Sequence, residues 1–265
     1  MIAIVVLTYN RLDLLRQCVE NVLLKTSEKT QEILIWDNAS TDGTGEYLDS
    51  LSDPRIRVVK HAENIGQNAY ALAVPMTTAP YFIEMDDDIV DAPQGWDATM
   101  VAAFENLPEI GFLQAQLADD GYSPGANLFY REKAHLYRRT EINGVDLWVD
   151  GPVGGGCTMT SRELYDRVGG FRQNKTEVFW HEDAAYIQDI QKLGYGKAIL
   201  AEVVVVHYGG SAYSDMVPEK TAYYERRRSR DRRKDRIKRA ILSLPLIPAL
   251  NERYGWFQPP PARSG

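Results

Sequence analysis

The chain has 265 residues, with 30 Lys and Arg against 37 Asp and Glu, a formal net charge of −7 and 44% hydrophobic residues. These values are ordinary for a globular protein, and they exclude a disordered chain, a collagen and a coiled coil. The acidic balance also argues against non-specific binding of nucleic acid by the whole surface, although a local basic patch is compatible with it.

The N-terminal half alternates β-branched apolar runs with segments of helical periodicity. Continuous apolar runs predict strands that are buried on both faces. The predicted strands are residues 2–7, 33–36, 55–60 and 81–85, and the predicted helices are residues 12–23, 46–51 and 66–74, the last ended by Pro75. This order favours an α/β fold with an open, mostly parallel, Rossmann-like sheet flanked by helices.

The pattern of the second half is less regular. Predicted helices are residues 96–106, 162–168 and 184–193, and predicted strands are residues 110–116, 127–131, 145–149, 157–160 and 198–206. We expect one domain over residues 1–215, made of a first half of about 1–116 and a second half of about 117–215. Residues 216–265 would form a C-terminal helical extension and tail, which is basic because residues 219–240 hold eleven Lys and Arg against four Asp and Glu.

Polar clusters follow three of the predicted strands, at residues 8–11, 37–42 and 86–88. Ligands bind beyond the carboxyl ends of the strands in open α/β sheets. The shared position of the three clusters therefore predicts a binding site at this edge of the sheet.

Asp86, Asp87 and Asp88 are three adjacent carboxylates that repel one another. At a strand end Asp86 and Asp88 would point to one side and Asp87 to the other, so a hard divalent cation would relieve the repulsion of the outer pair. His207, at the end of an apolar strand, could add an imidazole ligand. An exposed acidic turn and a structural histidine are the alternatives.

Two further features could carry chemistry. Glu182 and Asp183 follow an aromatic cluster at a helix start, where a carboxylate could act as a general base or simply cap the helix. Gly154, Gly155 and Gly156 would let the backbone approach a ligand closely, or form a flexible loop. The glycine run does not match the Walker A or dinucleotide pattern.

In their order, these motifs resemble the family 2 glycosyltransferases, inverting enzymes of the GT-A fold. The resemblance covers about residues 1–215, and it implies a nucleotide-sugar half of about 1–116 and an acceptor half of about 117–215. It rests on residues 5–11, 36–44, 63–66, 86–88, 168–171, 180–183, 194–195 and 206–208.

The resemblance implies a nucleotide-sugar donor, with UDP as the expected nucleotide, and a divalent metal, Mn²⁺ or Mg²⁺. The residues implied to bind the donor are Thr8, Tyr9, Asn10, Arg11, Asp37, Asn38, Asn64, Asp86 and Asp87. The implied metal ligands are Asp86, Asp88 and His207. Asp183 is the implied base, and the implied acceptor contacts are Trp180, Glu182, Gly155 and Gly156.

Such an enzyme transfers a sugar by in-line displacement, so the base and the metal lie on opposite sides of the sugar. The family often has a second Asp where this chain has Ala185, and an Arg near Gln188. These departures put acceptor and diphosphate contacts in question. A nucleotidyltransferase is a weaker alternative, since no glycine-rich basic loop follows the first strand, and a non-catalytic nucleotide- or glycan-binding module is another.

The basic segment from Arg226 to Arg239 has three explanations. It could form a solvated helix face, contact an anionic membrane with the help of the apolar residues 240–250, or contact a polyanionic acceptor such as DNA.

The sequence leaves open the identity of the acceptor, which could be a glycan, a lipid-linked molecule, a protein or a nucleic acid. Residues 240–250 are too short and too interrupted by proline to span a bilayer. Since we find no signal peptide and only two cysteines, we expect a cytoplasmic protein, with peripheral contact at the inner membrane face as the alternative.

Overall fold

The computed structural model describes residues 1–118, 133–177 and 180–208, and in the C-terminal segment residues 225–226, 229–230, 232–234 and 236–237. The chain divides into two units, Met1–Ser211 and Ala212–Gly265. The predicted strand 127–131 lies outside the described residues. In the described part of the chain, no helix has both the length and the apolar character needed to cross a bilayer.

The first half of the larger unit follows the predicted order. Its strands are β1 (Ile2–Thr8), β2 (Thr30–Asp37), β3 (Ile56–Lys60) and β4 (Tyr81–Asp86), and its helices are α1 (Leu12–Lys25), α2 (Thr44–Asp49) and α3 (Asn68–Ala73). The predicted helix over residues 66–74 is α3, which begins two residues later and ends at Ala73, ahead of Pro75. The chain continues through a 3₁₀ turn, η1 (Val74–Met76), because proline is tolerated in the first turn of a helix.

The second half contains elements that the sequence did not predict. Its elements are β5 (Ile89–Asp91), α4 (Trp96–Glu105), β6 (Ile110–Leu117), η2 (Ala134–Leu136), β7 (Arg138–Ile142), β8 (Val145–Val149), β9 (Cys157–Ser161), α6 (Arg162–Val168), α7 (Glu182–Lys192) and β10 (Gly196–His207). Of these, β5 and β7 were missed, since β5 is three residues long and β7 is mostly polar and exposed.

The strands form one sheet in the order β3-β2-β1-β4-β9-β6-β10-β8-β7, with β5 paired to β10. Strands β3, β2, β1, β4, β6 and β10 run in one direction, and β9 runs against its neighbours β4 and β6. The predicted mostly parallel sheet is therefore confirmed, with β9 antiparallel at its centre and antiparallel pairs of β10 with β5 and β8, and of β8 with β7, at one edge.

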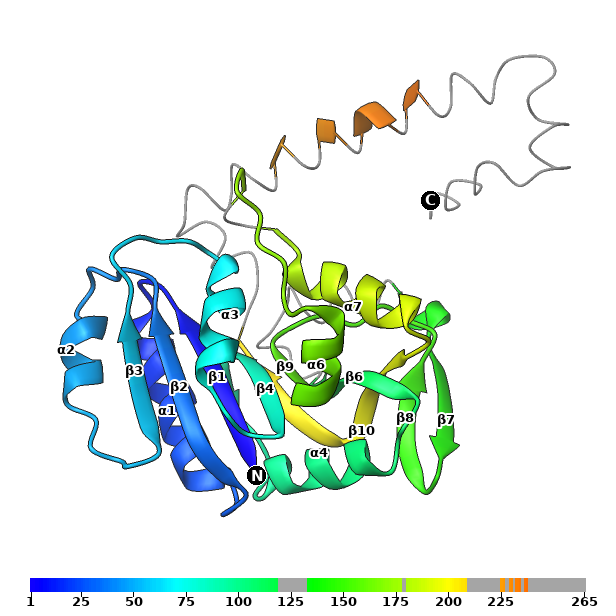
Figure 1. Cartoon of the computed structure of the whole chain (residues 1–265), viewed down its shortest axis with the longest axis horizontal. Helices are drawn as coiled ribbons and strands as arrows, with labels where there is room; N and C mark the ends of the chain where they lie inside the picture. The colour runs from blue at the N-terminus through cyan, green and yellow to red at the C-terminus, as the bar shows by residue number, and fades with distance from the viewer. Residues whose placement is uncertain are drawn as a thin grey trace, which may run out of the picture. The chain divides into compact units, whose positions relative to one another are not determined.

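Helices cover both faces of this sheet (Figure 1). Side chains that alternate along β1 show the two faces, since Ile4 packs with α1, α2 and α4 while Val5 packs with α3, α6 and α7. Both side chains are fully buried. Coverage of both faces explains why the strands read as continuous apolar runs rather than as alternating patterns.

Strand register brings the polar clusters to one level. Thr8 lies beside Asp37 across β1 and β2, and Leu7 lies beside Asp86 across β1 and β4. The three clusters predicted to share an edge thus meet at the carboxyl ends of neighbouring parallel strands, where ligands bind in folds of this kind.

Candidate active site

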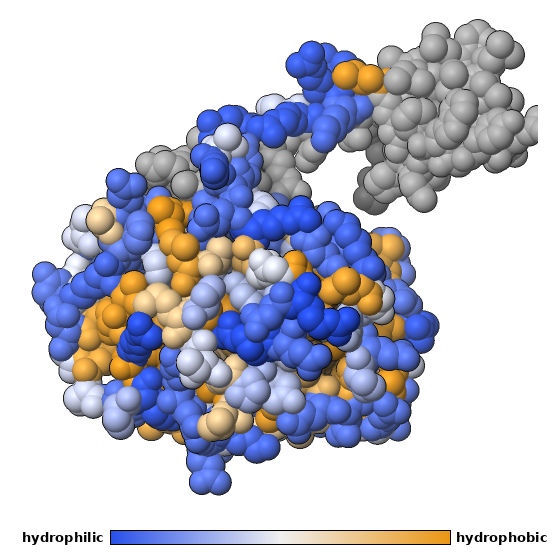
Figure 2. All heavy atoms as spheres, in the orientation of Figure 1, coloured by the Kyte–Doolittle hydropathy of each residue, from blue (hydrophilic) through white to orange (hydrophobic). Residues whose placement is uncertain are grey.

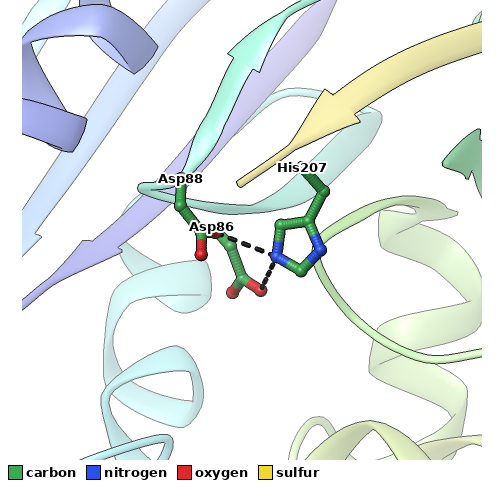
Figure 3. A group of neighbouring side chains, drawn as sticks. All are labelled: Asp86, Asp88 and His207. Carbon is green, nitrogen blue, oxygen red and sulfur yellow. Dashed lines mark ion pairs between the residues drawn. The ribbon is translucent and has the colours of Figure 1, made fainter. Parts of the chain in front are cut away.

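The acidic triplet divides between two sides of a turn. Asp86 ends β4, and Asp87 and Asp88 form the turn that leads into β5. Asp87 points toward β1, where its Oδ2 accepts a hydrogen bond of 2.7 Å from Thr8 Oγ1. Asp86 and Asp88 face the other way, toward His207 (Figure 3). The predicted separation of the outer pair from the middle residue is what the geometry shows.

Arg11 connects the two sides of this turn. Its Nη1 lies 2.5 Å from Asp87 Oδ1, and its Nη2 lies 2.6 Å from Asp88 Oδ2. Burial raises the pKa of Asp87 to about 7, against the lowering effect of Arg11. Burial would also raise the pKa of Asp88, but His207 and Arg11 together hold it below its usual value.

His207 reaches the triplet through β5. This short strand pairs with the end of β10, with His207 beside Ile89, and the Tyr208 backbone N–H donates a 2.8 Å hydrogen bond to the Asp88 carbonyl. His207 Nε2 then lies 3.0 Å from Asp88 Oδ1 and 3.6 Å from Asp86 Oδ2. Burial lowers the pKa of His207, but the two carboxylates outweigh it and raise the pKa to about 10.

These three side chains fit a divalent cation. Asp86, Asp88 and His207 each offer one ligand atom, and the three atoms lie within 4.8 Å of one another. Asp88 Oδ1 is buried, and among the described residues its close polar contact is His207 Nε2 at 3.0 Å, an ion pair that lacks hydrogen-bond geometry. Two carboxylates and one imidazole suit an ion such as Mn²⁺, which accepts both oxygen and nitrogen ligands.

The implied base, Asp183, lies near this group through the glycine run. It is the second residue of α7, and its Oδ2 accepts a 2.8 Å hydrogen bond from the Gly155 N–H. The Gly156 carbonyl in turn accepts a 2.7 Å hydrogen bond from the Asp86 N–H. Adjacent glycines thus connect the backbone of the acidic triplet to the carboxylate of Asp183.

Two buried glutamates lie beside Asp183, and the sequence analysis missed one of them. A Cβ at Gly155 would lie 2.6 Å from Glu84 Oε1, so the glycine makes room for this carboxyl. The pKa of Glu84 is raised mainly by burial, and further by the nearby charges of Asp183 and Asp86. The pKa of Glu182 is likewise raised mainly by burial, and further by Glu84 and Asp183. The signal in the sequence is that Glu84 is the single charged residue of the predicted strand 81–85.

Several residues that the resemblance implies for the nucleotide site meet at the ends of β1 and β2. Exposed Asn10, with φ of 51°, accepts a 2.7 Å hydrogen bond from Thr41 N–H through its Oδ1, and buried Asp37 accepts one of 2.9 Å from Ser40 N–H. Tyr9 is partly exposed at the same edge. These contacts order the loop that follows β2.

Asn38 and Asn64, which the resemblance implies as contacts of the nucleotide, form hydrogen bonds within the protein. Asn38 is buried, accepts from Trp36 Nε1 and donates to the Gly66 carbonyl. Asn64 Oδ1 accepts from the Gly66 N–H at 2.9 Å. Both amides therefore hold the loop before α3.

Trp180, an implied acceptor contact, is fixed from α3. Its Nε1 donates a 3.1 Å hydrogen bond to Asn68 Oδ1, which also accepts from the Asn174 N–H at 2.7 Å. Asn68 Nδ2 donates back to the Asn174 carbonyl at 3.0 Å. Asn68 was not among the predicted site residues, because its role depends on a segment more than a hundred residues away.

Comparison with protein families shows to which family the chain belongs. The model of the family described as glycosyl transferase family 2 matches residues 3–169, which is more than half of the chain. The chain belongs to glycosyl transferase family 2. The predicted family is thereby confirmed, and the match identifies a glycosyltransferase domain.

Curated relatives are longer than this chain. An uncharacterized protein, y4gI, of Sinorhizobium fredii is 24% identical over 246 residues, which cover 85% of this chain and 26% of the relative. Glycosyltransferase GlyG of Streptococcus pneumoniae is 38% identical over 95 residues, which cover 34% of this chain and 31% of the relative. The chain thus matches about a quarter to a third of the length of these relatives.

Solved structures of glycosyltransferases share the fold. A mannosyltransferase from Pyrobaculum calidifontis, in complex with GDP-Man and Mn²⁺, aligns with a TM-score of 0.55 and 21% identity over 78% of this chain and 56% of the other. TarS 1–349 of S. aureus, in complex with UDP-GlcNAc, aligns with a TM-score of 0.55 and 14% identity, and the alignment covers 79% of this chain and 59% of the other. These similarities confirm the predicted GT-A fold.

Proposed function

We propose that this protein is a metal-dependent inverting glycosyltransferase. It moves a sugar from a nucleotide-sugar donor to an acceptor hydroxyl by a single in-line displacement. The observation that carries the proposal is the pairing of an Asp86, Asp88 and His207 group with a separate carboxylate, Asp183, across the glycine run. In-line displacement needs a leaving-group stabiliser and a base that come from different sides of the sugar.

The roles of the side chains follow from this arrangement. Asp183 accepts the proton of the acceptor hydroxyl, whose ordinary pKa is far above neutral. Hydrogen bonding from the Gly155 N–H orients the Asp183 carboxylate. Asp86, Asp88 and His207 hold the divalent ion, which supplies Lewis-acid stabilisation of the charge on the leaving diphosphate.

A nucleotide-sugar donor is supported by relatives of the same fold. The mannosyltransferase structure contains GDP-Man and Mn²⁺, and the TarS structure contains UDP-GlcNAc. We favour a UDP-linked donor, since the carboxylate of Asp37, at the end of β2, can accept a hydrogen bond from the imide N–H of uracil. Tyr9, Asn10 and Thr8 would line the same nucleotide site.

Two substitutions test the division of labour. A thermal-shift screen of nucleotide sugars with Mn²⁺ first identifies the donor, because a ligand of the native state raises apparent stability. Asp88→Ala should then lose Mn²⁺-dependent donor binding. Asp183→Asn should keep donor binding and lose about 10²–10⁴-fold in kcat, the usual contribution of a general base. NMR of the product should show inversion at the anomeric carbon.

The matched control is Asp189→Asn, in the same helix as Asp183 but paired at the surface with Arg172 and Lys192. It should keep a kcat close to that of the wild type. Full activity of both Asp88→Ala and Asp183→Asn would overturn the site assignment. Donor binding by the wild type with neither transfer nor hydrolysis would instead indicate a non-catalytic binding module.

A further inference from the structure

Arg11 lies in a different place from the one that the family resemblance implies. The resemblance puts it against the nucleotide. In the structure its guanidinium lies between two carboxylates, with Nη1 on Asp87 and Nη2 on Asp88. The Arg11 side chain is 8% exposed, and those of Asp87 and Asp88 are 3% and 4% exposed. The charge of Arg11 is therefore directed at the acidic turn itself.

This contact divides the two oxygens of Asp88 between different partners. Oδ2 receives Arg11 Nη2 at 2.6 Å, while Oδ1 lies 3.0 Å from His207 Nε2. Oδ1 is one of the atoms in the candidate metal group. With Oδ2 held by Arg11, the carboxylate cannot rotate without breaking a buried charge-assisted hydrogen bond. Arg11 thus fixes which oxygen of Asp88 faces the ion.

Asp87 anchors Arg11 in this position. One oxygen of Asp87 accepts from Thr8 Oγ1 at 2.7 Å, and the other receives Arg11 Nη1. The chain of contacts runs from the end of β1 through Asp87 and Arg11 to Asp88. A forked guanidinium can satisfy two separate carboxylates at once, whereas the single ammonium of a lysine cannot reproduce both geometries.

We propose that Arg11 is a positioning residue of the metal site: through Asp87 and Asp88 it orients a metal ligand instead of contacting the nucleotide. This inference rests on the proposed metal-dependent function. Groups that orient metal ligands typically change metal affinity about 10–100-fold when they are removed.

Binding of Mn²⁺ to the full chain in the absence of nucleotide tests the proposal. Free Mn²⁺, followed by electron paramagnetic resonance, gives the affinity of the wild type and of each variant. Arg11→Met should bind Mn²⁺ about 10–100-fold more weakly. Arg11→Lys should recover part of the affinity, because it restores the charge without the fork. Excess Mn²⁺ should raise the kcat of Arg11→Lys toward that of the wild type, which a general loss of structure would not allow.

Two further variants make the result decisive. Thr8→Val removes the hydroxyl that donates to Asp87 and leaves the volume of the side chain nearly unchanged. It should weaken Mn²⁺ binding less than Arg11→Met does. It also tests the same chain of contacts if Arg11→Met does not fold. Arg172→Met removes an exposed arginine that pairs with Asp189, and it should leave Mn²⁺ affinity unchanged.

The outcomes separate this inference from the proposed function. If the wild type binds Mn²⁺ and both Arg11 variants bind it equally well, Arg11 does not orient the site and the inference is wrong. Unchanged Mn²⁺ affinity with a loss of metal-free nucleotide binding would place Arg11 on the nucleotide instead. If the wild type itself binds no Mn²⁺, the metal-dependent function fails, and the inference with it.

Discussion

Glu182 shows how strongly a single side chain near Asp183 depends on its surroundings. It is 5% exposed at the first position of α7, with Glu84 and Asp183 close to it. Burial and these two neighbours raise its pKa, since each disfavours the ionised form. The surroundings of Glu182 thus disfavour its ionised form beside the proposed base.

This environment predicts the pH dependence of stability. A folded-state pKa above the unfolded value of 4.5 gives a stability contribution that is complete below about pH 4.5 and is lost as pH rises through the folded pKa. Glu182→Gln cannot ionise, so its free energy of unfolding relative to the wild type should increase with rising pH. Urea denaturation at several pH values from about 5 to about 8 measures the difference in free energy of unfolding between the variant and the wild type.

An exposed glutamate provides the control for this measurement. Glu109→Gln changes a side chain at the surface before β6. Its curve of unfolding free energy against pH is the reference for removal of a carboxylate that is exposed to solvent. A Glu182→Gln curve that runs parallel to the Glu109→Gln curve would show that Glu182 ionises as freely as a surface acid.

At the scale of elements, the short strand β5 explains why His207 belongs to the site. Its pairing with β10 brings the end of the last strand to the turn after β4. A three-residue strand has no periodicity to detect, so the sequence predicted the strands on either side and not the contact between them. His207 was nevertheless a candidate ligand, because an imidazole after an apolar strand can bind a metal and the family resemblance implied that role.

The same contrast separates the predicted from the missed site residues. Asp86, Asp88, Asp183 and His207 were candidates by side-chain chemistry at strand or helix ends, and the family resemblance implied their roles. The contacts of Arg11, Glu84 and Asn68 depend on how distant segments pack, and local patterns carry no information on that. The alternating strands and helices of the first half were predictable for the opposite reason, since both faces of those strands are buried and their apolar runs are unbroken.

The tether between α3 and the segment before α7 predicts a specific defect. Asn68 makes three hydrogen bonds with Trp180 and Asn174, so Asn68→Ala should loosen the acceptor side while the metal group stays intact. A displacement of about 1 Å can cost about 100-fold in rate. We expect an increase of about tenfold or more in the KM for the acceptor, with donor affinity unchanged, in steady-state kinetics.

Asn68→Asp serves as the matched variant. It keeps the oxygen that accepts from Trp180 and from the Asn174 N–H but loses the donor to the Asn174 carbonyl. Its acceptor KM should fall between those of the wild type and Asn68→Ala. An acceptor KM unchanged in both variants would show that the tether has no part in acceptor binding.

At the scale of the whole molecule, charge is unevenly distributed between the two units. Residues 219–240 carry an excess of Lys and Arg, while the chain as a whole has a net charge of −7. The described residues between 225 and 237 are all exposed, and they are mainly hydrophilic in Figure 2. An exposed cationic segment that precedes the apolar residues 240–250 suits contact with an anionic phosphate surface.

Substitution of Arg226, Arg230 and Arg233 by glutamine tests this contact. Each cation near an anionic bilayer contributes about 1 kcal/mol, so the triple variant should bind vesicles that contain phosphatidylserine about 100-fold more weakly. Sedimentation with vesicles measures the change. A parallel titration with duplex DNA distinguishes a membrane from a nucleic acid partner.

The control replaces Arg138 and Arg139, which pair with Asp150 and Asp146 at the surface of the larger unit. That double variant should bind vesicles as the wild type does. If the wild type binds neither vesicles nor DNA, the charges of residues 226–239 are simply solvated.

The pairing of β5 with β10 has one more consequence. An ion held by Asp86, Asp88 and His207 would join two parts of the chain that are more than a hundred residues apart in the sequence. Cross-links that close long loops restrict the unfolded chain most, because the entropy of loop closure grows with loop length. The bound cation would then stabilise the end of β10, and its removal would loosen that end of the strand. Amide hydrogens at the end of β10 would exchange faster when the ion is chelated, so the order of this strand would report occupancy of the site.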